Sequence, residues 1–127
     1  MANNLFLLSH YTGNRDYLNM GGKMIDLVIG KAVNDPLDYM NWLNVSIDYS
    51  KNFYEIVVVG RNAFQISEDL TSRYLPNTLV AASKSDVDEY LIKNRYIKGD
   101  TLIYVCVNNS CKFPVETVDE ALKLILN

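Results

Sequence analysis

The feature that most constrains the fold is a run of β-branched residues in the middle of the chain, between Tyr54 and Gly60. Polar and apolar residues alternate in a strand that has one face in solvent, whereas a continuous apolar run is typical of a parallel strand covered on both faces. Shorter apolar runs predict two more strands, at residues 78–82 and 101–107. The second half of the chain therefore needs a sheet with helices packed on it.

Helical signals separate these strands. Asn62 opens a helix after the first strand, and Pro76 ends it. Ser85 with Asp88 resembles a capping box for a short helix through Leu91, and Thr117 with Glu120 is a capping box for a final helix over 118–126. Strands that alternate with helices imply right-handed parallel crossovers. Residues 53–127 are therefore expected to form a small three-stranded parallel βαβαβα unit.

Residues 1–52 carry only helical signals. Gly13 ends a short apolar helix, and Asn14 caps a longer one. Asp35 as N-cap and Pro36 at the first helical position predict the start of a third helix. The pair Gly21-Gly22 interrupts the second helix, so either a neighbouring backbone comes very close there or the helix bends. Because the loops are short, the helices should be antiparallel neighbours, which makes the whole chain α/β with an N-terminal helical hairpin layer.

Charge and hydropathy exclude several functions. The 127 residues include 12 Lys and Arg against 15 Asp and Glu, a net charge of −3 that argues against nucleic-acid or anionic-membrane partners. The longest apolar runs are too short to span a bilayer. The first residues lack the basic and apolar regions of a signal peptide, so a reducing cytoplasm is expected, with the cysteines as two thiols.

The two cysteines, Cys106 and Cys111, allow two interpretations. With His10 as the single histidine, the chain cannot close a four-ligand zinc site, and no metal or cofactor is expected. A redox pair needs one thiol activated by a helix N-terminus or a nearby cation, for which Lys112 is a candidate. Alternatively, Cys106 is a small buried apolar residue in its strand and the thiols only pack the sheet.

A strand followed by Gly60 and a helix is the place where dinucleotide-binding folds hold pyrophosphate. The other glycines of that fingerprint and a Walker-type lysine are missing, so a turn that needs a small residue is the simpler interpretation. In an open parallel sheet the carboxyl ends of the strands share one edge, where ligands bind. The candidate ligand-binding residues at that edge are Gly60, Arg61, Asn108, Asn109 and Lys112, beside the redox candidates Cys106 and Cys111.

The segment from Tyr104 to Val115 reads Tyr-Val-Cys-Val-Asn-Asn-Ser-Cys-Lys-Phe-Pro-Val. It resembles the C-terminal signature of the thioredoxin-domain-containing proteins related to spermatogenesis-associated protein, in which Tyr-Val-Cys is followed by Asn, a second Cys and Pro. Residues 55–60, 74–77 and 4–18 resemble earlier segments of the same family in the same order. The resemblance covers nearly the whole chain, and the Cys-Asn-Cys-Pro segment is its most specific part.

Proteins of that family are several times longer. They combine a thioredoxin-like domain with a six-hairpin α/α barrel like those of glycoside-processing enzymes and sugar epimerases, and this chain is similar only to the tail. The resemblance implies a non-catalytic C-terminal accessory domain without turnover of its own, part of a longer parent chain. Helices cut from a barrel keep apolar faces, so a homodimer through the N-terminal helices is expected. The alternative is a small redox or ligand-binding module that uses Cys106 and Cys111.

Overall fold

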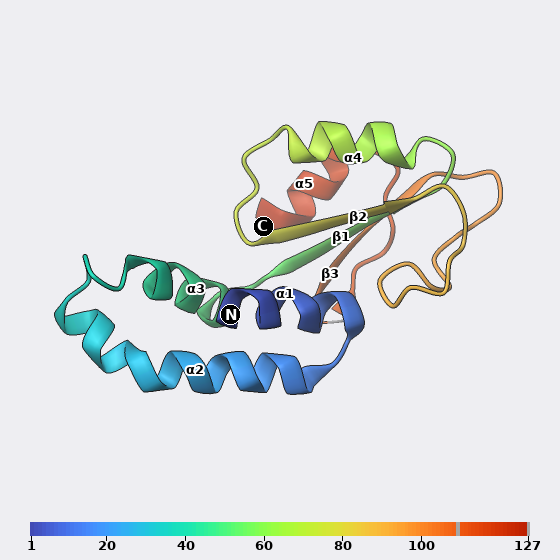
Figure 1. Ribbon diagram of the computed structural model, residues 1–127. Helices are drawn as coiled ribbons and strands as arrows, with labels where there is room; N and C mark the ends of the chain where they lie inside the picture. Colours follow the sequence, from blue (N-terminus) through green and yellow to red (C-terminus); the bar gives the residue numbers. More distant parts are fainter. Residues whose placement is uncertain (109, 127) are drawn as a thin grey trace. The chain divides into compact units, whose positions relative to one another are not determined.

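The structure is a computed structural model that describes residues 1–108 and 110–126, without the side chain of Leu126. The chain divides into two compact units, Met1–Asn52 and Phe53–Asn127. The first unit is helical, and the second contains a sheet with helices, so the chain is α/β as the sequence predicts (Figure 1).

The first unit contains helices α1 (Ala2–Thr12), α2 (Arg15–Asn34) and α3 (Met40–Ser50). Gly13 ends α1 in the left-handed region, with φ 70°. The side chain of Asn14 then accepts a hydrogen bond of 2.9 Å from the backbone N–H of Asp16, which satisfies a donor that would otherwise be unpaired at the start of α2. These two residues confirm the predicted boundary between the first two helices.

The predicted start of the third helix is wrong. Asp35 does not cap a helix with its side chain; its backbone N–H donates to the carbonyl of Lys31 and thereby ends α2. Residues 36–39 form a turn, and α3 begins at Met40. Since α2 continues through Asn34, the chain needs these residues to reverse direction, and Pro36 serves the turn rather than the first helical position.

The two glycines in α2 do not break the helix. A Cβ at Gly21 would overlap the hydroxyl of Tyr49 from α3 and would lie 3.2 Å from the carbonyl oxygen of Ala2 in α1. Gly22 faces the ring of the same tyrosine. Of the two interpretations left open by the sequence, a close approach of neighbouring groups is therefore the correct one.

The second unit contains β1 (Tyr54–Val59), α4 (Ala63–Thr71), β2 (Thr78–Ser83), β3 (Leu102–Val107), β4 (Ser110–Cys111) and α5 (Val118–Leu126). In the described residues these strands form one sheet with the order β2-β1-β3-β4. β1 pairs with β2 in parallel, but β3 runs antiparallel to β1, and β4 folds back on β3 as a hairpin. The expected three-stranded parallel sheet is thus corrected to a mixed sheet of four strands.

The direction of β3 follows from the segment before it. Residues 84–101 contain no helix, although the Ser85–Asp88 pattern predicts one. The first turn of the segment has Ile92 and Lys93 both donating to the carbonyl of Glu89, and Asn94 follows with φ 63°; a second turn precedes β3, where the N–H of Asp100 donates to the carbonyl of Ile97. The segment begins and ends at the same end of β1, because Ser83 and Leu102 both pair with Val59, so β3 returns antiparallel to β1 and β2.

The two faces of the sheet carry different residues. Ile56 and Val58 of β1, together with Ile103 and Val105 of β3, form a buried core with α4 and α5, which both cover this face (Figure 1). Because side chains alternate along a strand, Glu55 and its paired residue Cys106 lie on the opposite face. Both are also buried. The β-branched run is therefore covered on both sides, as predicted.

Gly60 offers a test of the packing at the end of β1. It has φ 135°, and a Cβ there would lie 2.6 Å from the Cα of Thr101 and overlap the carbonyl oxygen of Asp100. Gly60→Ala should lower the free energy of unfolding by roughly 2–4 kcal/mol, since backbone strain and overpacking act together. Gly99→Ala is the matched control, because Gly99 also has positive φ, 101°, but open space around it. Urea unfolding should show a clearly smaller loss for Gly99→Ala; equal losses would contradict the close approach at Gly60.

Candidate functional site

The candidate site lies on the β3–β4 hairpin at the edge of the sheet. Cys106 pairs with Cys111 and Val107 with Ser110, so residues 108 and 109 connect the strands. Asn108 is exposed and has φ 50°, a left-handed conformation that asparagine tolerates better than most residues and that tight hairpins require. The predicted site residue Asn109 lies outside the described residues.

Cys106 and Cys111 form a disulfide, with their Cα atoms 3.9 Å apart. The backbone N–H of Lys112 donates to the carbonyl of Val105, 3.0 Å away, so the cysteines occupy the neighbouring non-hydrogen-bonded pair, where side chains approach most closely. The expectation of two free thiols is therefore wrong. Its physical reason is the hairpin, whose register places the two sulfur atoms directly opposite each other.

The two sulfur atoms have different surroundings. Cys106 is 0% exposed on β3, whereas Cys111 is exposed on β4. One end of the disulfide is thus accessible to a reagent in solution and the other is enclosed by the sheet.

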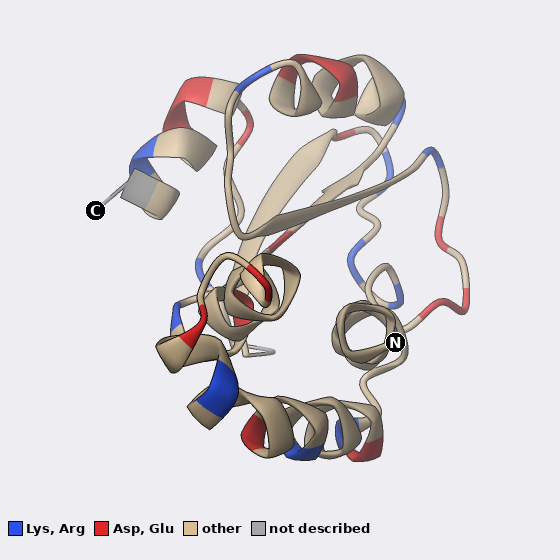
Figure 2. Ribbon diagram, turned by 60° about the vertical axis from the view of Figure 1, so that its left-hand side comes forward, with Lys and Arg blue, Asp and Glu red and all other residues tan. Residues whose placement is uncertain are grey.

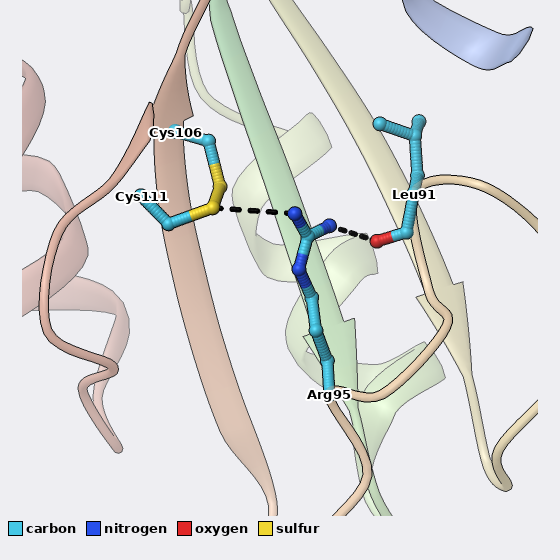
Figure 3. The surroundings of a disulfide bond; sticks show 4 residues. All are labelled: Leu91, Arg95, Cys106 and Cys111. Carbon is cyan, nitrogen blue, oxygen red and sulfur yellow. Dashed lines mark hydrogen bonds between the residues drawn. A yellow bond between two sulfur atoms is a disulfide. The ribbon is translucent and has the colours of Figure 1, made fainter. Parts of the chain in front are cut away.

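Arg95 is the cation next to the disulfide, and the sequence did not predict it. Its guanidinium donates to the Sγ of Cys111 over 3.2 Å and to the backbone carbonyl of Leu91 (Figure 3). The Tyr104 hydroxyl donates to the carbonyl of Arg95 over 2.9 Å, and the guanidinium carbon lies 5.8 Å from the centroid of the Tyr104 ring. These contacts hold both the backbone and the guanidinium of Arg95, so the positive charge stays beside the Sγ of Cys111.

Lys112 does not take the role expected for it. Its Nζ donates over 2.8 Å to the carbonyl of Leu124, near the end of α5, where a cation interacts favourably with the helix dipole. Lys112 thus binds a helix end, and Arg95 lies by the sulfur instead.

Gly60 and Arg61 lie far along the sheet from the cysteines. Because β3 is antiparallel, Cys106 is opposite Glu55 at the start of β1, whereas Gly60 follows Val59 at its other end. The space over Gly60 is filled by residues 100 and 101, and the N–H of Asn62 donates to the Thr101 hydroxyl over 3.3 Å. The predicted common edge therefore does not exist, and the turn fits the simpler interpretation of a small residue in a crowded place.

Other titratable groups have structural roles. The hydroxyl and backbone N–H of Thr117 both donate to the carboxylate of Glu120, which lowers the pKa of Glu120. Glu120 in turn donates its backbone N–H to the Thr117 hydroxyl, which confirms the predicted capping box of α5. In the helical unit, burial raises the pKa of Asp48 and, with the charge of Asp48 as a smaller cause, that of Tyr49.

A metal-binding cluster and a surface depression are the other features that could form a ligand site. The described residues hold no group of three or more His, Cys, Asp or Glu side chains that could bind a metal. An open depression of about 470 Å³ lies in the helical unit, between the start of α1 and Trp42 on α3. None of the sequence-predicted site residues lines it. In the described part of the chain no helix is long and apolar enough to cross a membrane.

Reduction of the disulfide should destabilise the chain without unfolding it. The bond closes a short loop, so its entropic contribution is only about 2 kcal/mol. Urea unfolding with and without a phosphine reductant measures this difference. Cys111→Ser should match the reduced chain, whereas Cys106→Ser should lose more, because it places a hydroxyl in a fully buried position. Equal stability of the oxidised and reduced chains would contradict the prediction.

Comparison of the chain with protein-family models, with curated proteins and with solved structures found no match.

Proposed function

We propose that the chain is a non-catalytic accessory module that acts by associating through its helical unit. The observation that carries this proposal is the number of large apolar side chains exposed on that unit. Leu27 is 81% exposed and Leu37 is 85% exposed. The other exposed large apolar residues of this unit are Met1, Leu8, Tyr11, Met20, Val33, Met40 and Ile47.

Two of the three helices, α1 and α3, carry few charges beside their exposed large apolar residues, which are Leu8 and Tyr11 on α1 and Met40 and Ile47 on α3. α1 contains no Lys, Arg, Asp or Glu, and Asp48 is the single charged residue of α3 (Figure 2). On α3, Met40 and Ile47 are two turns apart and so share one helix face. A charge-poor apolar surface of this kind typically marks an interface.

A second copy of the chain is the partner we propose. The net charge of −3 is small for 127 residues, so electrostatic repulsion between two copies is weak. The simplest assembly is a two-fold dimer through helices of residues 1–52. The resemblance to the tail of thioredoxin-domain-containing six-hairpin proteins supports the same kind of role, since there the helices would pack on the rest of a longer chain.

The test is the mass of the chain in solution. Sedimentation equilibrium should show a dimer, and the double variant Met40→Glu/Ile47→Glu should weaken it by at least about tenfold in Kd, because two charges would be buried in the interface. Asn41→Glu on the same helix is the control, since residue 41 is exposed and lies about a quarter turn away from that face. A monomeric wild type, or a dimer unaffected by the double variant, would overturn the homodimer.

The disulfide supports a second candidate function, that of a small redox module. An exposed sulfur beside a guanidinium is the setting in which a thiolate is stabilised. In a reducing cytoplasm, the compartment we propose, such a pair would respond to changes in the thiol–disulfide balance.

Redox titration of the intact chain tests this candidate. In glutathione buffers the Cys106–Cys111 pair should titrate reversibly with a midpoint above about −300 mV, because a disulfide with an exposed sulfur is more readily reduced than a buried structural one. A pair that stays oxidised throughout the buffer range would leave the disulfide with a purely structural role.

A further inference from the structure

The two cysteines of the disulfide should differ in reactivity, because different groups lie beside each sulfur. Cys111 is an exposed residue, and its Sγ accepts a hydrogen bond from Arg95. A hydrogen bond from a charged donor strengthens when the acceptor becomes an anion, so Arg95 favours the thiolate of Cys111 after reduction. Lys112, the cation that directly follows Cys111 in the sequence, is held at the end of α5.

The buried sulfur has a carboxylate as its neighbour. Glu55 is the β1 residue directly opposite Cys106, so the two side chains share one face of the sheet, with Cβ atoms separated by about 4.5–5.5 Å. Glu55 is 1% exposed and Cys106 is 0% exposed. Because Cys106 has no exposed surface, a side chain on the same face of the sheet has to accept the proton of its thiol, and Glu55 is the titratable residue paired with it.

We propose that the pair exchanges with small-molecule disulfides, with Cys111 as the attacking sulfur, Cys106 as the resolving sulfur and Glu55 as the proton acceptor for Cys106. This inference rests on the redox module proposed above and assigns the role of each group in it. Arg95 stabilises the attacking thiolate.

The reaction balances in two steps. The Cys111 thiolate attacks one sulfur of a disulfide RSSR; the bond between the two R-bearing sulfurs breaks, a mixed disulfide forms on Cys111, and one RS⁻ leaves. Glu55 then takes the proton of the Cys106 thiol, and the Cys106 sulfur attacks the Sγ of Cys111. The Cys106–Cys111 bond forms and a second RS⁻ leaves. The two cysteines lose two electrons and RSSR gains them, while the proton of the Cys106 thiol is held on Glu55.

Single-cysteine variants test the assignment of the sulfurs. Each variant is reduced, freed of reductant and mixed with glutathione disulfide, and the products are followed by intact mass. Cys106→Ser should accumulate a mixed disulfide on Cys111, because no resolving sulfur is present. Cys111→Ser should react at least about tenfold more slowly, since Cys106 is buried. Faster reaction of Cys111→Ser than of Cys106→Ser would overturn the assignment.

Arg95 and Glu55 should affect different steps. Arg95→Gln should slow formation of the mixed disulfide by about threefold to tenfold, and Arg95→Lys, which keeps the charge, should recover most of the rate. Glu55→Gln keeps the shape of the side chain; it should leave the first step unchanged and slow closure of the disulfide by at least about tenfold. Equal effects of both variants on both steps would indicate a purely structural role and contradict the assignment.

The two proposals can fail separately. If the pair does not titrate in glutathione buffers, the redox module fails, and this inference fails with it. If the pair titrates but the mixed disulfide forms on Cys106, or closure does not depend on Glu55, the module stands and only the roles assigned here are wrong.

Discussion

The second unit depends on the burial of β1 from both sides. Ile56, Val57 and Val58 are fully buried, and the strand has a neighbour on each edge, β2 in parallel and β3 antiparallel. Burial removes water from every backbone group of the strand, so both edges must be paired. β3 satisfies one of these edges, and its own outer edge pairs with β4 in the hairpin that carries the cysteines.

The direction of β3 determines which residues surround the two cysteines. An antiparallel β3 separates Cys106 from Gly60 and brings it opposite Glu55, while its hairpin partner β4 carries Cys111. The preceding turn packs Leu91 into the interior and holds Arg95 over the edge. A disulfide that joins an enclosed cysteine opposite Glu55 to an exposed cysteine beside Arg95 is therefore a consequence of strand order and direction.

Local signals predicted most of the elements, but they also indicated a helix through Leu91 that is absent and did not indicate β4, because strand pairing depends on residues far apart in sequence. The β-branched run, the Asn14 cap and the Thr117–Glu120 capping box depend on neighbouring residues, and all three are observed. The parallel direction predicted for β3 depended on a helix between the second and third strands, and residues 84–101 contain none. Arg95 is 16 residues from Cys111 and no motif connects them. The spacing Cys-Val-Asn-Asn-Ser-Cys did contain a usable signal, since two asparagines between short strands favour a tight hairpin.

We propose that the helical unit mediates association and that the redox chemistry lies at the sheet edge. Hydrogen–deuterium exchange of the intact wild-type chain, compared at low and high chain concentration, detects association through the helical unit. Peptides from α1 or α3 should exchange more slowly at high concentration, with exchange in β1 unchanged. Exchange in the helical unit that is independent of concentration would contradict association through these helices.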